Sequence, residues 1–235
     1  MAVRAAVQYI AHYVIRELGL GCYVPASVAA AATSMRVLDS RLFDRLGGTI
    51  FVEDIDNLIT YTGIDRDTLT GIPASSTGSI SATINPYTNA SRDLVWRCDL
   101  LNSYELELMI DRFRRRIEGE KMIRDVTRKL HRSIRGWYDT GVELRDANDD
   151  SYSAVVADTI NYETGTFDFS SARDVSEQLY LFGYGYNPYA VIGEFLESFA
   201  EDDRWNTYSQ IGQTARSKES LRDMANQWRA RGTFL

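Results

Sequence analysis

Three carboxylates close together in the sequence, Glu53, Asp54 and Asp56, are the groups best suited to acid–base chemistry. A glycosidase uses two such groups at a defined separation, one as general acid and one as nucleophile or base. Sequence spacing does not establish that separation, and these residues follow a predicted strand, where solvated acids are ordinary. His12 and His131 each fall in a predicted helix, where a packed or surface histidine is more common than a catalytic one. We therefore predict no catalytic residue and a protein that is not an enzyme.

An acidic loop at residues 139–152 has the best match to a metal-binding motif. Asp146, Asn148 and Asp150 alternate like the first ligands of an EF-hand calcium loop. Ser151 replaces the glycine that the turn requires, and Ala157 stands where the bidentate glutamate belongs. The loop is better interpreted as an acidic surface, so we predict no metal and no cofactor. The sequence also contains no nucleotide-binding, hydrolase-elbow or zinc-protease motif.

Composition indicates a globular protein of one large domain or two small ones. The chain has 235 residues, of which 44% are hydrophobic and 25% charged. Cys22 and Cys98 share no motif spacing with each other or with the histidines, so neither a disulfide framework nor a zinc site is expected. A reducing compartment, such as the cytosol, fits this cysteine usage. No apolar run is long enough to cross a membrane, because residues 3–18 are interrupted by polar side chains.

One segment carries an unusual charge. Ten lysines and arginines lie in residues 112–135, against Glu118, Glu120 and Asp125, which gives +7 in a chain of net charge −7. Such a segment binds DNA phosphates in some proteins, whereas in many others it is a solvated face paired with acidic neighbours. In an assembly protein it meets an acidic face of the next subunit or of a partner. The candidate contacts to a partner or to DNA in a channel are Arg112, Arg114, Arg115, Arg116, Lys121, Arg124, Arg128 and Lys129.

Apolar residues at helical spacing predict several helices. An amphipathic helix is expected within residues 3–18 and ends at Gly19, and a second is expected from about residue 25 to 46. The longest is expected from about 103 to 137, with Gly119 as a possible kink. Two more are expected at residues 189–205 and 217–231, the second with Ser217 as its N-cap.

Two short segments have the alternation and turn residues of β-hairpins. The first covers residues 49–79, and the second covers 154–169, where Glu163-Thr164-Gly165 reverses the chain. A further strand is expected near residues 94–96, and residues 80–91 form a loop arm. We predict that the hairpins contact neighbouring subunits through Tyr61, Gly63, Asp65, Arg66, Gly71, Tyr162 and Gly165.

These elements predict an α+β fold with a mainly helical body and two small β-hairpin segments. The expected divisions are N-terminal helices at 1–48, a β-rich segment with a loop arm at 49–100 and a long basic helix at 101–138. An acidic loop with the second hairpin follows at 139–188, and a C-terminal helical segment at 189–235. All are expected to pack as one compact body.

The hairpins and the C-terminus carry a resemblance. The patterns Tyr-Thr-Gly and Thr-Leu-Thr-Gly (61–63 and 68–71) and Asn-Tyr-Glu-Thr-Gly-Thr-Phe-Asp-Phe (161–169) resemble β modules of tailed-phage virion proteins. The order of an acidic patch (200–203), a short polar strand (207–211) and a helix with Ser217, Ser220, Leu221, Ala225 and Arg229 resembles the end of phage head–tail connector proteins.

The resemblance implies a structural virion protein (an adaptor or neck protein) at the head–tail junction, assembled in the host bacterial cytoplasm. Such proteins form a ring, commonly a dodecamer, that binds the portal protein and tail or neck proteins. Double-stranded DNA passes through the channel of the ring, and no membrane is involved. Other virion roles, such as a tail terminator or baseplate hub, stay open. A DNA-binding protein and a hydrolase are the alternatives from other classes.

Overall fold

The computed structural model describes residues 4–52, 57–86, 93–97, 101–147, 153–201 and 217–232. Strands make up 31% and helices 28% of the described residues, which form four antiparallel sheets and four α-helices. The predicted fold class, a mainly helical body with two small β-hairpin segments, is therefore wrong. Much of the segment that was expected to be helical pairs as strands instead.

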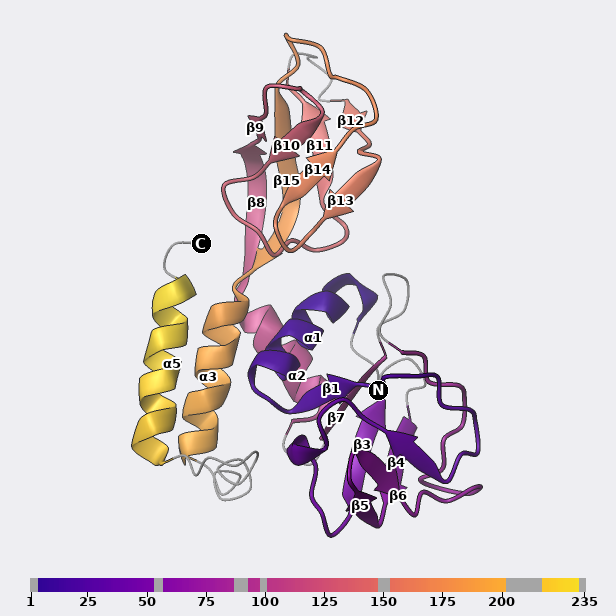
Figure 1. Ribbon diagram of the computed structural model, residues 1–235. Coiled ribbons are helices and arrows are strands. Elements are labelled where there is room, and N and C mark those ends of the chain that lie inside the picture. The colour runs from indigo at the N-terminus through magenta and orange to yellow at the C-terminus, as the bar shows by residue number, and fades with distance from the viewer. Residues whose placement is uncertain are drawn as a thin grey trace.

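The four α-helices form the centre of the molecule, which we call the helical body (Figure 1). They are α1 (Gln8–Glu17), α2 (Ser103–Arg112), α3 (Pro188–Glu201) and α5 (Lys218–Gly232), and the short 3-10 helix η1 (Ala5–Val7) precedes α1. Helices α3 and α5 lie alongside each other, and Arg229 of α5 pairs with Glu194 of α3 at 3.0 Å. Their apolar faces share one core with α1 and α2.

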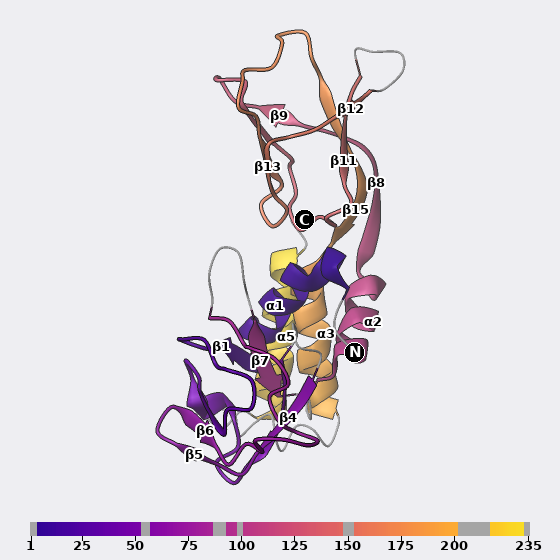
Figure 2. The ribbon, with the colours of Figure 1, turned by 90° about the vertical axis from the view of Figure 1, so that its right-hand side faces the viewer.

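A β module packs beside the helical body (Figure 2). Its first sheet has the order β1-β7-β3-β4, and its second has the order β2-β6-β5. The strands are β1 (Gly21–Tyr23), β2 (Ser34–Arg36), β3 (Gly48–Val52), β4 (Asn57–Tyr61), β5 (Gly63–Asp65), β6 (Thr68–Thr70) and β7 (Leu94–Arg97), with the 3-10 helix η2 (Ser40–Leu42) between β2 and β3. The module has its own apolar core.

A second unit, residues 114–186, is inserted between α2 and α3, and we call it the β lobe (Figure 1). One of its sheets has the order β12-β11-β15-β8 and the other β13-β14-β10-β9. The strands are β8 (Arg114–Lys121), β9 (Ile123–Arg124), β10 (Leu130–Arg132), β11 (Glu143–Asp146), β12 (Ala154–Val155), β13 (Thr159–Asn161), β14 (Thr166–Asp168) and β15 (Leu179–Tyr186). Side chains from both sheets form a third core.

Two features join the β lobe to the helical body. Strands β8 and β15 pair antiparallel along their whole length, so the chain enters from α2 and leaves into α3 as a two-stranded stem. Beside this stem, Trp137 of the lobe is buried in the core of the helical body. Its ring lies 4.5 Å from the ring of Tyr13 and 6.2 Å from that of Tyr189. The lobe is thus fixed by packing as well as by the chain itself.

The predicted long helix at residues 103–137 is wrong beyond its first turns. Helix α2 begins with a capping box of Asn102 and Glu105 and ends at Arg112. The next residues have alternating exposure, with Ile117 buried between exposed charged neighbours, which is the pattern of a strand. Gly119 has φ +88°, which is incompatible with a helix and coincides with a register shift between β8 and β15. The apolar residues at steps of three and four therefore do not lie on one helix.

The predicted helix at about residues 25–46 is also wrong. This segment contains β2 and the single turn η2. Val28 pairs with Ile84 as an isolated bridge, and Ala31, with φ +60°, donates its backbone N–H to the carbonyl of Ile80. Long-range backbone pairing therefore outweighs the local helical preference of its alanines.

Other predicted elements are confirmed. The first amphipathic helix is α1, and Gly19 follows it with φ +69°. The hairpin in 154–169 is the β13–β14 pair, and the strand near 94–96 is β7. The helices expected at 189–205 and 217–231 are α3 and α5, and the Ser217 hydroxyl accepts the N–H of Ser220 at 3.1 Å as an N-cap.

Candidate partner-binding surface on the β lobe

Nine of the ten cations of residues 112–135 lie on the β lobe, most of them along one edge, and they do not share one face of a helix. Arg112 ends α2, four cations lie on β8, and Arg124 lies on β9. Arg128 and Lys129 occupy the turn between β9 and β10, and the last two lie on or after β10. We call the surface of β8, β9 and residues 125–135 the cationic edge, because β8 and β9 are edge strands of the two sheets.

Only three of these ten cations have an ion pair among the described residues. Arg112 pairs with Glu194 at 3.4 Å, Arg115 with Glu120 at 3.7 Å, and Arg116 with Glu118 at 3.0 Å. The other seven have no carboxylate within 4.0 Å in the described chain. Intramolecular pairing therefore neutralises a minority of the cationic edge, and most of its charge is available to a partner.

Strand alternation decides which arginines of β8 face outward. Arg114 and Arg116 are exposed, and the guanidinium of Arg114 lies 3.4 Å from the ring centroid of Tyr184 on β15. Arg115 points to the interior, where it pairs with Glu120 and lies 5.7 Å from the ring of Tyr138. Arg115 is thus a structural residue, and its neighbours on either side are the candidate contacts.

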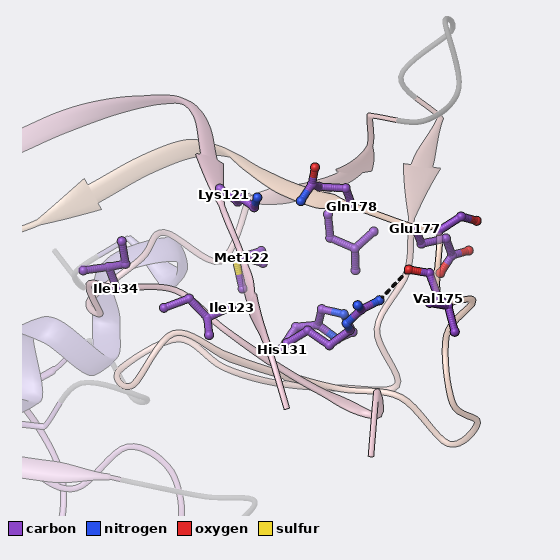
Figure 3. A pocket seen from close by; sticks show the side chains of 11 residues that line it. Lys121, Met122, Ile123, His131, Ile134, Val175, Glu177 and Gln178 are labelled. Atoms are coloured by element: carbon purple, nitrogen blue, oxygen red, sulfur yellow. Dashed lines mark hydrogen bonds between the residues drawn. The ribbon is translucent and has the colours of Figure 1, made fainter. Parts of the chain in front are cut away.

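A pocket of about 430 Å³ opens on the cationic edge (Figure 3). Its apolar lining includes three strongly exposed side chains, Ile123 (57%), Ile134 (72%) and Val175 (66%). Lys121 and Arg124 supply positive charge, and the Arg124 guanidinium donates to the carbonyl of Val175 at 2.9 Å. The pocket therefore combines an apolar wall with two cations that have no ion pair in the described chain. Glu177 also lines it and pairs with Arg173 at 2.7 Å.

His131 lies at the base of this pocket. It is buried, and its ring packs edge-on to Phe169 at 5.3 Å. Burial lowers the pKa of His131 below its ordinary value, and the nearby charges of Arg124 and Arg173 lower it further. A neutral, buried histidine without a carboxylate orienting it is a packing residue, so His131 is not placed for catalysis.

The turn after β9 is internally bonded. The Asp125 carboxylate accepts hydrogen bonds from the Thr127 hydroxyl at 2.7 Å and from the N–H of Leu130 at 3.3 Å. These bonds, that of the Thr127 hydroxyl first, lower the pKa of Asp125. The turn holds Arg128, with φ +60°, and Lys129, so these two predicted contacts are presented on an ordered element.

The opposite edge of the β lobe is anionic. Edge strands β12 and β13 lie there, across the sheets from β8 and β9 (Figure 1). In described residues 143–168, one cation, Arg145, accompanies five carboxylates: Glu143, Asp146, Asp158, Glu163 and Asp168. We call this surface the anionic edge. The acidic loop was predicted from sequence, but its position opposite the cations was not, because it depends on strand order.

The predicted subunit contacts of the first hairpin segment differ in exposure. Asp65 and Arg66 are exposed at the β5–β6 turn, where Arg66 has φ +53°. Tyr61 is buried, and its hydroxyl donates to the carbonyl of Asp44 at 3.0 Å. Gly63 is partly buried, and Gly71 has φ +69° beside the Thr62 side chain. Asp65 and Arg66 are thus accessible, whereas Tyr61 stabilises the β module itself.

The two predicted contacts of the second hairpin face the interior of the molecule. Tyr162 packs against the lobe core, with its ring 6.3 Å from that of Tyr9. Gly165 has φ +65°, and a Cβ there would lie 2.5 Å from the carbonyl oxygen of Arg135. This hairpin turn therefore holds the segment around Trp137 in place.

Several candidate residues fall outside the described part of the chain, including Glu53, Asp54, Asp56, Cys98 and the calcium-like positions Asn148 and Asp150. Asp146 is described, and its carboxylate accepts the N–H of Gln178 at 3.2 Å. Among described residues, no group of three or more His, Cys, Asp or Glu side chains is arranged to hold a metal ion. No described helix is long and apolar enough to cross a membrane.

Comparison with protein-family models, with curated proteins and with solved structures found no match.

Proposed function

We propose that this protein is a structural subunit of a tailed-phage head–tail junction, where it forms a ring between the portal and the tail. The observation that carries the proposal is the pair of opposed charged edges on a β lobe that is fixed rigidly to the helical body. Such a subunit works by presenting complementary surfaces rather than by chemistry. The sequence resemblance to connector proteins supplies the particular setting.

Rigid coupling of the lobe supports an assembly role. The Tyr9 hydroxyl donates to the carbonyl of Tyr138, and the backbone N–H of Thr140 donates to the carbonyl of Ala6 at 3.4 Å. These bonds and the buried Trp137 hold the lobe at a set orientation. A preformed interface loses less conformational entropy on association than a flexible one, so each docking step is more favourable.

The test is attachment to tail-less capsids. Purified protein is mixed with capsids that carry the portal but lack the tail, and occupancy of the portal vertex is imaged. We expect wild-type protein at one vertex and a strong loss of occupancy for the double variant Arg116→Glu with Lys129→Glu. Arg115 stays unchanged in this variant because it is structural. Capsids that never acquire wild-type protein would overturn the proposal.

DNA binding is the second candidate, favoured by the seven unpaired cations and by the Arg114–Tyr184 stack. A duplex-binding protein that contacts several phosphates loses affinity steeply as salt is raised. A steep salt dependence of affinity, together with no attachment to capsids, would favour DNA binding. Passage of DNA through a ring requires no such affinity.

A further inference from the structure

We infer that the β lobes of neighbouring copies dock head-to-tail, with the β12–β13 connection of one copy seated in the pocket on the cationic edge of the next. This inference rests on the proposed function and names the two surfaces that would close the ring. It is argued from three features: an exposed apolar side chain on one edge, a pocket with an apolar wall on the other edge, and charges of opposite sign beside the two.

The projection is Val156, between β12 and β13. It is 87% exposed, which is unusual for a valine beside a buried neighbour, Ala157. Asp158 follows two residues later and is also exposed, and its carboxylate accepts the N–H of Ser170 at 2.6 Å. That hydrogen bond anchors the segment, so the valine and the carboxylate are presented together at a fixed spacing.

The receiving surface is the pocket of Figure 3. Ile123, Ile134 and Val175 give it an apolar wall that is left largely open to solvent. An aliphatic side chain such as Val156 would cover that wall. Lys121, which has no ion pair in the described chain, lines the same pocket and would meet the carboxylate of Asp158. Both the apolar and the charged contacts are thus complementary.

The placement of these surfaces suits a second copy of this chain. Strand β9 and strand β12 lie on opposite sides of the lobe, and both views show them toward the end far from the helical body (Figures 1 and 2). Surfaces at a similar level on opposite sides can meet when copies stand side by side. A contact between two different surfaces of identical subunits repeats from copy to copy. It forms a closed ring when the rotation between successive copies divides a full turn evenly.

Two single variants each remove one half of the contact. Val156→Asp places a charge on the projection, and Ile134→Asp places one in the pocket; both side chains are strongly exposed, so the fold should persist. We expect each to weaken self-association about 10- to 100-fold, because burial of an aliphatic side chain is lost. Leu46→Asp is the matched control: Leu46 is 90% exposed but lies between η2 and β3 in the β module, outside both edges of the lobe.

Mixing the two variants tests the head-to-tail geometry. Each variant retains the surface that the other lacks, so one intact contact forms between them. We expect monomers from each variant alone, a one-to-one dimer from the mixture, and wild-type assembly from Leu46→Asp, all by mass measurement. Circular dichroism of each variant checks the fold, and Lys121→Glu serves as a second pocket variant.

Failure of this inference is distinguishable from failure of the proposed function. If wild-type protein forms rings or occupies the portal vertex while Val156→Asp and Lys121→Glu both assemble normally, the lobe contact is wrong and the connector role stands. If wild-type protein stays monomeric and ignores capsids, both are overturned.

Discussion

Trp137 should be the residue whose loss most weakens the joint between the β lobe and the helical body. It is buried in the core of the body, and three tyrosine rings, those of Tyr9, Tyr13 and Tyr189, have centroids between 4.5 and 6.2 Å from it. Replacing a buried aromatic residue by alanine typically costs about 3–5 kcal/mol. Each aromatic pair adds roughly 0.5–1.5 kcal/mol beyond burial, which places Trp137→Ala in the upper part of that range.

The assay is urea unfolding followed by circular dichroism, with the free energy of unfolding extrapolated to water. Tyr9→Phe is the matched comparison, because it keeps the stacked ring and removes only the hydroxyl that donates to Tyr138. We expect the loss of that hydrogen bond to lower the free energy of unfolding by about 0.5–1.5 kcal/mol. In Trp137→Ala, the lobe and the body should also unfold in separate transitions, since each keeps its own core. If Trp137→Ala lowered the free energy of unfolding by less than about 1 kcal/mol and unfolded in a single transition, the role assigned to Trp137 would be refuted.

Three further predictions concern particular residues. Gly165→Ala should destabilise the protein by about 1–3 kcal/mol, because a Cβ at φ +65° would meet the Arg135 carbonyl. Gly63→Ala should cost much less in the same unfolding assay, because the atoms nearest to a Cβ there are 3.7 Å away. Because the pKa of His131 is lowered in the folded protein, the unfolded state binds more protons below about pH 6.5, so stability should fall from pH 7 to 5 and fall less in His131→Gln. Burial raises the pKa of the Cys22 thiol to about 11, so the unfolded state releases its proton first; stability should fall as pH rises from about 8.5 toward that value, and Cys22→Ala should show a smaller fall. Equal slopes for wild type and either variant would contradict the corresponding pKa assignment.

The sequence predicted the elements whose signals are local. Helix α1, helix α5 with its Ser217 cap and the β13–β14 hairpin follow from short-range spacing, caps and turn residues. The prediction of a long basic helix was wrong because apolar residues at steps of three and four also occur in a strand followed by a hairpin. Ile117 and Ile123 flank the one longer step of that stripe and were both assigned to the helix, although Ile117 is buried on β8 and Ile123 is exposed on edge strand β9.

The candidate site was predicted in composition but not in arrangement. The cationic segment stood out in the sequence, and most of its charge is indeed unpaired. Its opposition to the anionic edge depends on which strands occupy the sheet edges, and that order is set by long-range pairing of β8 with β15 and of β11 with β15. The role of Trp137 was missed for the same reason, since it was counted as the end of a helical stripe.

Mass measurement of the purified wild-type protein over a range of concentrations, with imaging of the largest species, tests the central claim most directly. The claim is that this chain assembles with itself through opposed edges of its β lobe. We predict that monomers convert to closed rings of one size as concentration rises, and that Val156→Asp prevents ring formation. A protein that remains monomeric at every concentration, alone and with tail-less capsids, would contradict it.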